Sequence, residues 1–232
     1  MSESSPVAFF DVWHTYQKVV AANHMFHREF AAQLSQFLYA RFAIEPFSFL
    51  DLGCGDAATL APVLKGCQVK SYKGVDLSEP ALALAVKNLG VLSCPVELVR
   101  NDISAALSVE TNIYDVIYSS FALHHLPLEE RAEFFRRAAR CVKKGGFLLL
   151  VDVTREEEET LEVYYRHYCS WLRGSFTALN PQELDRVCDH IVNNDLPEPL
   201  SVLQGQAGAA RLGNMERIAR YYWHHFLSFT RT

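Results

Sequence analysis

The stretch from Phe47 to Ala57 limits the possible folds of this chain more than any other part of the sequence. It opens with an apolar run that predicts a buried strand, and this strand ends in an acid, Asp51. Gly53 and Gly55 follow one residue apart, and a helical pattern begins at Ala57. Glycine permits a sharp turn and a close approach to a ligand, while the first turn of a helix offers unpaired N–H groups. The stretch therefore predicts a strand, a ligand-binding turn and a helix.

Two further predicted strands also end in acids. Asp76 closes the second apolar run, 25 residues after Asp51, and Asp102 follows the third. In open α/β sheets, ligands bind at the carboxyl ends of the strands, where a carboxylate can accept hydrogen bonds from both hydroxyls of a ribose. Asp51 is placed to accept hydrogen bonds from an ammonium group. The three acids together predict a nucleoside site with an amino-acid arm.

Two later motifs make the pattern specific. Residues 114–119 (YDVIYS) are followed by residues 123–127 (LHHLP), and residues 143–150 (KKGGFLLL) lead into another apolar strand. With the glycine turn, these motifs resemble those of the class I S-adenosylmethionine (SAM) dependent methyltransferases over residues 47–153. The chain departs from the family pattern at Ala57, where many members carry a third glycine.

The resemblance implies an α/β fold with a doubly wound, seven-stranded, mostly parallel sheet and a C-terminal antiparallel hairpin. We expect a helical lid over residues 1–45 and a SAM-binding domain over 46–232, with a helical substrate insertion at about 155–212. The predicted strands are 47–52, 69–76, 96–100, 114–119, 146–153, 215–222 and 223–230. The predicted helices of the core are 57–66, 79–91 and 128–142.

The resemblance also assigns residues to the cofactor, SAM. Those expected to hold it are Asp51, Gly53, Gly55, Asp76, Leu77, Asp102, Ile103, Ser119 and Arg28. The glycine turn and Asp51 would hold the methionine arm, Asp76 the ribose, and Asp102 with Ile103 the adenine. Arg28 is a candidate for the methionine carboxylate because its planar guanidinium can bind two oxygens.

Two other functions remain open at this point. The glycine turn also fits the dinucleotide pattern G-x-G-x-x-G/A of an NAD-dependent oxidoreductase, with Asp76 near the acidic position. Against this, Asp51 would bring a like charge to the pyrophosphate. The other alternative is a SAM-binding regulator or scaffold, which has the same fold but catalyses no reaction.

The expected reaction is methyl transfer to an oxygen or nitrogen of a small metabolite. Such a displacement needs alignment and exclusion of water, and a protonated acceptor also needs a base. The candidate catalytic residues are His124, Asp152, Tyr16 and His27. His124 and His125 are adjacent, so we expect at most one of them to face the reaction. The alternative is that both histidines only orient the following helix and that Asp152 binds loop amides.

Two helical additions flank the predicted core. In a continuous helix over residues 8–41, Tyr16, Val20, Asn23 and His27 would share one face, either as a lid over the donor or as a face toward water. In the insertion, residues 164–171 carry an aromatic stripe, which favours core packing over a substrate wall.

Composition limits the partners. A net charge of −5 argues against capture of nucleic acid, and six scattered cysteines without a C-x-x-C pair are typical of reduced thiols. With no leader and no membrane-spanning run in the sequence, we expect a cytoplasmic monomer or homodimer that acts on a small molecule. We expect no metal, because neither His124–His125 nor His224–His225 has ligand spacing on one helix face.

Overall fold

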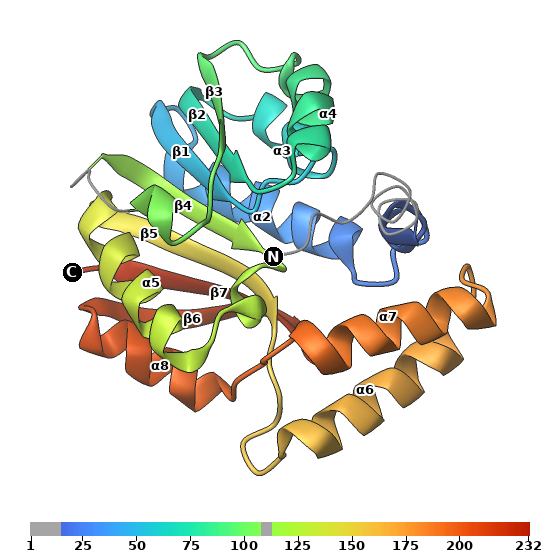
Figure 1. The fold of residues 1–232 in the computed structure, drawn as a ribbon. Coiled ribbons are helices and arrows are strands. Elements are labelled where there is room, and N and C mark those ends of the chain that lie inside the picture. Colours follow the sequence, from blue (N-terminus) through green and yellow to red (C-terminus); the bar gives the residue numbers. More distant parts are fainter. Residues whose placement is uncertain (1–14, 108–112) are drawn as a thin grey trace.

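A single mixed sheet organises the protein (Figure 1). The computed structural model describes residues 15–107 and 113–232. Seven strands run in the order β3-β2-β1-β4-β5-β7-β6. They are β1 (Phe47–Leu52), β2 (Val69–Asp76), β3 (Val96–Arg100), β4 (Tyr114–Ser120), β5 (Val142–Val153), β6 (Leu212–Tyr221) and β7 (His224–Arg231). β1 to β5 pair in parallel, whereas β7 is antiparallel to both β5 and β6.

Helices cover both faces of this sheet. One core cluster packs α2 (His27–Phe42), α3 (Leu60–Lys65) and α4 (Glu79–Leu89) against one face. The other cluster packs α5 (Leu128–Cys141) and α8 (Leu200–Ala209) against the opposite face. Short 3₁₀ turns follow two strands, η1 (Ala105–Leu107) and η2 (Leu123–His125). Within residues 15–107 and 113–232, no helix combines the length and apolar character needed to span a membrane.

The predicted sheet is confirmed with small shifts at its ends. β1, β2 and β3 have the predicted bounds, while β5 begins at Val142, four residues earlier than expected. The C-terminal hairpin also forms, although its turn falls at residues 222–223 and its first strand begins at Leu212. Alternating burial marks only part of β6, which lies at the sheet edge, so the sequence signal there is weak.

The prediction of one continuous helix over residues 8–41 is wrong for the part that the structure describes. A helix over residues 15–21 is followed by a turn, and α2 then begins at His27. Asn23 and Phe26 both adopt left-handed backbone with φ of 59°, which ends the first helix. Asn23 instead accepts a hydrogen bond from the backbone N–H of Arg28. Residues 8–14 lie outside the described part of the chain.

The break divides the predicted lid into two parts with different roles. α2 belongs to the core, because Phe30, Leu34 and Leu38 are almost fully buried against the sheet. Residues 15–26 lie away from that face, beside α6 and α7 (Figure 1). Residues 15–26 lie next to the insertion, while His27 and Phe30 at the start of α2 line a cavity described below.

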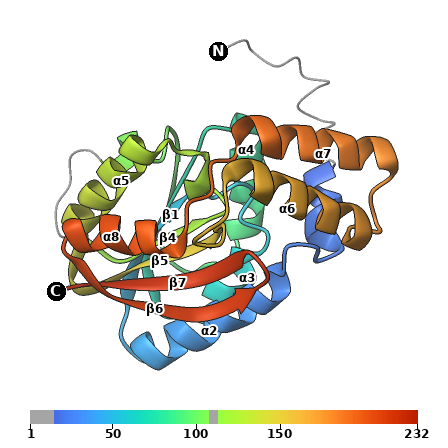
Figure 2. The same ribbon diagram turned by 90° about the horizontal axis from the view of Figure 1, so that it is seen from below.

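The predicted insertion likewise has two parts. α6 (Leu161–Ser175) and α7 (Pro181–Asn194) pair with each other and extend beyond the carboxyl edge of the sheet (Figure 2). α8 returns to pack on α5, so it is part of the core. Tyr164 and Tyr168 are buried against α7 and the hairpin, as expected for core packing, but Tyr168 also lines a cavity described below.

We predict that Leu34→Ala lowers the free energy of unfolding by about 2–4 kcal/mol, because the deleted side chain is buried in the α2–sheet core. Urea denaturation followed by circular dichroism measures this. The matched control is Gln36→Ala on the exposed side of the same helix, which should change stability by less than about 0.5 kcal/mol. Equal effects of the two substitutions would contradict the placement of α2 in the core.

Candidate functional site

The carboxyl ends of β1, β4 and β5 meet at one edge of the sheet. In the parallel register, Asp51 lies opposite Tyr118 and Ser120 opposite Val151. Two cavities open at this edge. The first lies over the glycine turn after β1, and the second lies between η2 and the helices α6 and α7.

The first cavity has a volume of about 70 Å³ and is built around the glycine turn. Its walls include residues of α2, α3 and the end of β4. The lining residues used below are Tyr16, His27, Asp51, Gly53, Gly55, Ser120 and Phe121. Three of the predicted donor-binding residues and two of the predicted catalytic residues therefore meet in one place.

The glycine turn needs its glycines for two different reasons. Gly53 has a φ of +77°, and a Cβ there would lie 2.9 Å from the Cβ of Ala122 in the loop after β4. Gly55 has a φ of +52°, and its backbone N–H donates to Oδ2 of Asp76 at 2.8 Å. The carboxylate of Asp76 thus fixes the turn, although Asp76 is not among the residues that line the first cavity.

Asp51 is the buried acid of the first cavity, with 2% of its surface exposed. Burial raises the pKa of its carboxyl from 3.8 to about 7, the hydrogen bond from Tyr72 opposes this rise, and nearby Asp76 adds to it. The Tyr72 hydroxyl donates to Oδ2 at 2.7 Å. A cationic ligand would stabilise the ionised form and so offset the cost of burying the charge.

The second cavity is larger, about 250 Å³, and shares Tyr16 and Phe121 with the first. Its walls are largely apolar, and its polar groups are concentrated at η2 and the end of α7. The lining residues are Thr15, Tyr16, Val19, Met25, Phe121, His124, His125, Val153, Tyr168, Phe176, Arg186, Val187, His190, Ile191 and Asp195. Tyr168 therefore both packs in the core and lines a cavity.

His124 and Asp152 form a buried pair beside the second cavity. Nδ1 of His124 contacts Oδ1 of Asp152, and the backbone N–H of His124 donates to Oδ2 at 3.1 Å. Burial opposes a charge on the imidazole, but the Asp152 carboxylate outweighs it and raises the pKa of His124. The contact orients the ring so that Nε2 points away from Asp152, toward Asp195 at 3.7 Å.

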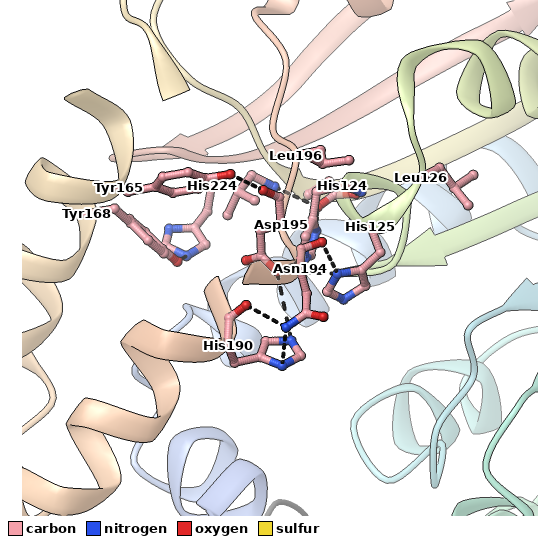
Figure 3. A network of polar contacts seen from close by, with 12 residues as sticks. His124, His125, Leu126, Tyr165, Tyr168, His190, Asn194, Asp195, Leu196 and His224 are labelled. Atoms are coloured by element: carbon pink, nitrogen blue, oxygen red, sulfur yellow. Dashed lines mark hydrogen bonds and ion pairs between the residues drawn. The ribbon is translucent and has the colours of Figure 1, made fainter. Parts of the chain in front are cut away.

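Two sequence-based arguments about the histidines fail here. His124 and His125 both line the second cavity, with ring centroids 4.1 Å apart, because η2 is a single tight turn that does not separate them to opposite faces. The argument that their spacing excludes a shared metal cluster also fails. Ligand atoms of His124, His125 and Asp195 lie within 4.8 Å of one another, because Asp195 comes from the end of α7 (Figure 3).

The other predicted donor residues lie outside the first cavity. Asp102 accepts hydrogen bonds from the backbone of Ser104 and Ala105 at the start of η1, and Ile103 is buried. The Ser119 hydroxyl is buried and donates to the carbonyl of Leu52. Leu77 is 64% exposed on the loop after β2.

Arg28 is not placed to bind a ligand in this structure. Its guanidinium donates to the carbonyl of Ala21 at 2.7 Å and so closes the helix over residues 15–21. His27, next to it, is buried and turns into the first cavity, where its Nε2 has no hydrogen-bond partner. Burial lowers the pKa of His27 to about 4, so this ring is neutral.

His190 and Asp195 also line the second cavity, and neither was predicted as a site residue. They are five positions apart at the end of α7 and carry no recognisable motif. Their role depends on how the chain after α7 docks on η2, through a hydrogen bond from the Leu196 backbone N–H to the carbonyl of His124 at 2.7 Å. No local pattern encodes that contact.

Comparison with known proteins supports the resemblance to methyltransferases. A family model described as a methyltransferase domain matches residues 49–146, which include the glycine turn and η2. A carboxy-S-adenosyl-L-methionine synthase from Idiomarina loihiensis is 30% identical over 124 residues, 51% of this chain and 50% of that protein. Residues 49–146 are thus similar to methyltransferase domains.

Other similar proteins differ in size. Phosphoethanolamine N-methyltransferase 3 from Arabidopsis thaliana is 30% identical over 106 residues, 46% of this chain and 21% of that protein. The chain thus spans about half the length of the carboxy-SAM synthase that it matches, and 21% of the length of the plant protein. The SAM-dependent methyltransferase SibL shares the fold with a TM-score of 0.62 at 16% identity, covering 93% of this chain and 57% of that one. The family uses SAM as its cofactor.

We predict that SAM binding strengthens as the pH rises toward 7, because the donor is cationic and Asp51 must be ionised to bind it. Below the raised pKa of about 7, affinity should fall by up to about tenfold per pH unit. Calorimetric titration of SAM between pH 5.5 and about 8 measures this. In Asp51→Asn, binding should be weaker and this dependence on pH should disappear.

The matched variant is Tyr72→Phe, which keeps the carboxyl but removes its hydrogen-bond donor. The midpoint of the pH dependence of SAM affinity should move to a higher pH, because the hydrogen bond from Tyr72 lowers the pKa of Asp51. In the absence of SAM, the stability of the folded protein depends on pH with the opposite sign. The folded protein holds the Asp51 proton more tightly than the unfolded chain, so this contribution to stability is present below pH 3.8 and is lost as the pH rises through about 7. Identical pH profiles for wild type and Asp51→Asn would contradict the assignment.

Proposed function

We propose that this protein transfers a methyl group from SAM to an oxygen or nitrogen of a small molecule bound in the second cavity. The observation that carries the proposal is that the two cavities share Tyr16 and Phe121. A donor held over the glycine turn would therefore present its methyl group to an acceptor on the other side of these two rings. This adjacency is what an in-line displacement requires.

The donor side of the proposal rests on Asp51, Gly53 and Gly55. Asp51 would bind the amino group of the methionine arm, and the glycine turn would let the backbone approach it. Asp76 has two carboxylate oxygens on backbone N–H groups, of Gly55 and Ser78, each at 2.8 Å. Each oxygen keeps a second lone pair with which it would bind a ribose hydroxyl. Asp102 and Ile103 remain proposed for the adenine.

The acceptor side rests on the second cavity, whose volume suits a small molecule rather than a macromolecular segment. In the transfer, a lone pair of the acceptor forms the new bond to carbon while the carbon–sulfur bond breaks and its electrons return to sulfur. His124, oriented by Asp152, presents Nε2 to the cavity and would take the proton of a hydroxyl or ammonium acceptor.

The segment over residues 15–26 is proposed to close over both ligands. Tyr16 lines both cavities, and His27, at the start of α2, contacts Phe121 edge to face at 5.2 Å between ring centroids. Closure would exclude water from the reacting groups. The six cysteines are all free thiols, which supports a reducing compartment such as the cytoplasm.

We predict that the purified protein forms S-adenosylhomocysteine when SAM is supplied with the right member of a small-molecule acceptor library. Mass spectrometry detects both this product and a mass increase of one methyl group in the acceptor. Gly53→Ala should abolish the reaction, because the added Cβ would overlap Ala122 in a backbone that already has positive φ. Binding of SAM without turnover on any acceptor would favour the regulator or scaffold instead.

Once an acceptor is found, His124→Ala should lower turnover by roughly 10²–10⁴-fold while SAM affinity changes by less than about tenfold, because His124 lies in the acceptor cavity alone. Asp152→Asn preserves the shape of the pair but removes its charge, so it should also lower turnover. His167→Ala, on the exposed surface of α6, is the control. Wild-type turnover in both active-site variants would exclude His124 from catalysis.

A further inference from the structure

Nitrogen atoms of three histidines converge on one carboxylate oxygen in the second cavity (Figure 3). Oδ1 of Asp195 lies 3.7 Å from Nε2 of His124, 3.3 Å from Nδ1 of His125 and 3.9 Å from Nε2 of His190. None of these contacts is a hydrogen bond, and Oδ1 is buried without a partner. A buried carboxylate oxygen that only faces nitrogen atoms at these distances lacks the group that would satisfy it. Nδ1 of His125 also lies 3.4 Å from the carbonyl oxygen of Asn194, which places the ring proton on Nδ1 in the absence of an ion. An ion bound at Nδ1 would replace this contact and move the ring proton to Nε2.

The chain holds Asp195 in this position from several sides. The hydroxyl of Tyr165 donates to the Asp195 carbonyl at 2.5 Å, and the next residue, Leu196, bonds through its N–H to the carbonyl of His124. Arg131, itself almost fully buried, donates to the carbonyls of both Leu126 and Leu196. These bonds connect the end of α7 to the loop around η2, so the two sources of the cluster are fixed together.

The imidazole of His124 is also held in place by a neighbouring residue. Its Nδ1 is occupied by Asp152, which fixes the ring and leaves the lone pair of Nε2 facing Asp195. A carboxylate on the far nitrogen is the usual support of a histidine that binds a metal, because it sets the tautomer and raises the basicity of the ligand. Here that support is completely buried, since Asp152 is 4% exposed.

We propose that His124 Nε2, His125 Nδ1 and Asp195 Oδ1 bind a divalent transition-metal ion of the zinc type. Ligand atoms about 2.1 Å from a tetrahedral ion are about 3.4 Å apart, close to the 3.3 and 3.7 Å that separate Asp195 Oδ1 from these two nitrogens. Two imidazoles favour such an ion over Mg²⁺ or Ca²⁺, which prefer oxygen ligands.

His190 is not part of this ligand set. Its Nδ1 faces the side-chain Nδ2 of Asn194 at 3.3 Å, and because that amide nitrogen can only donate, the proton of the ring belongs on Nε2. Nε2 then points its N–H toward Asp195 as an outer partner. Three protein ligands leave one position open to the cavity, as in catalytic zinc sites.

The metal site would serve the methyl transfer proposed above, so its role rests on that proposed function. An ion with one open position would bind an oxygen of the acceptor, so we expect an acceptor that carries a hydroxyl or a carboxylate. Coordination would release the hydroxyl proton to water and leave an oxygen lone pair for the donor methyl. His124 would then act as a ligand, and its Nε2 would no longer accept the proton directly.

The test is metal binding by the full chain without donor or acceptor. Protein dialysed against a chelator is titrated with Zn²⁺ by calorimetry, and with Co²⁺ by visible absorption, which reports a tetrahedral site. We expect one ion per chain. Asp195→Asn and His125→Ala should each weaken Zn²⁺ binding at least tenfold, and Asp152→Asn by about 10–100-fold through the orientation of His124.

The matched control is His167→Ala, which removes an exposed histidine paired with Glu159 elsewhere on the surface. It should bind Zn²⁺ like the wild type, and circular dichroism should show every variant folded. If one variant fails to fold, the other two still decide. No binding of Zn²⁺, or equal affinity in wild type and all cluster variants, would overturn the site.

SAM binding, measured in the same samples, separates this inference from the proposed function. Methyl transfer that persists at full rate in the chelated protein would overturn the role of the metal in the reaction and leave the methyltransferase function intact. Zinc binding that depends on Asp195, in a protein that binds no SAM, would support the site and overturn the function.

Discussion

The parallel pairing of β4 with both β1 and β5 is the constraint on which both cavities depend. It brings Asp51, Ser120 and Asp152 to the same edge of the sheet, although they are distant in sequence. The edge is buried by residues 15–26 on one side and by α6 and α7 on the other. Asp51 and Asp152 are both buried at this edge, Asp51 in the first cavity and Asp152 beside the second. Asp51 contacts Tyr72, and Asp152 contacts His124.

The second cavity depends on an additional contact that the core fold does not require. α6 and α7 extend away from the sheet, and the chain after α7 returns to η2 through Leu196 and Arg131. This return places Asp195 beside the histidines that follow β4. A helical insertion thus contributes both part of the apolar wall of the second cavity and one of its charged groups, Asp195.

Much of the fold was predictable because it is encoded locally. The alternation of apolar runs and helical patterns gave β1, β2 and β3 with their correct bounds, and the glycine turn located the first cavity. The break at Asn23 was not predictable, since neither asparagine nor phenylalanine demands left-handed backbone. The histidine cluster was missed for a different reason. It joins η2 to the end of α7, some 70 residues later, and only the docked chain shows that both adjacent histidines face one cavity.

The central claim is that donor and acceptor occupy adjoining cavities separated by Tyr16 and Phe121. A crystal structure of the protein with S-adenosylhomocysteine and Zn²⁺, with anomalous data at the zinc edge, tests it most directly. The account predicts the amino group of the ligand on Asp51, its sulfur directed toward the second cavity, and an anomalous peak between His124 and Asp195. A ligand bound elsewhere, or with its sulfur facing away from Phe121, would contradict the account.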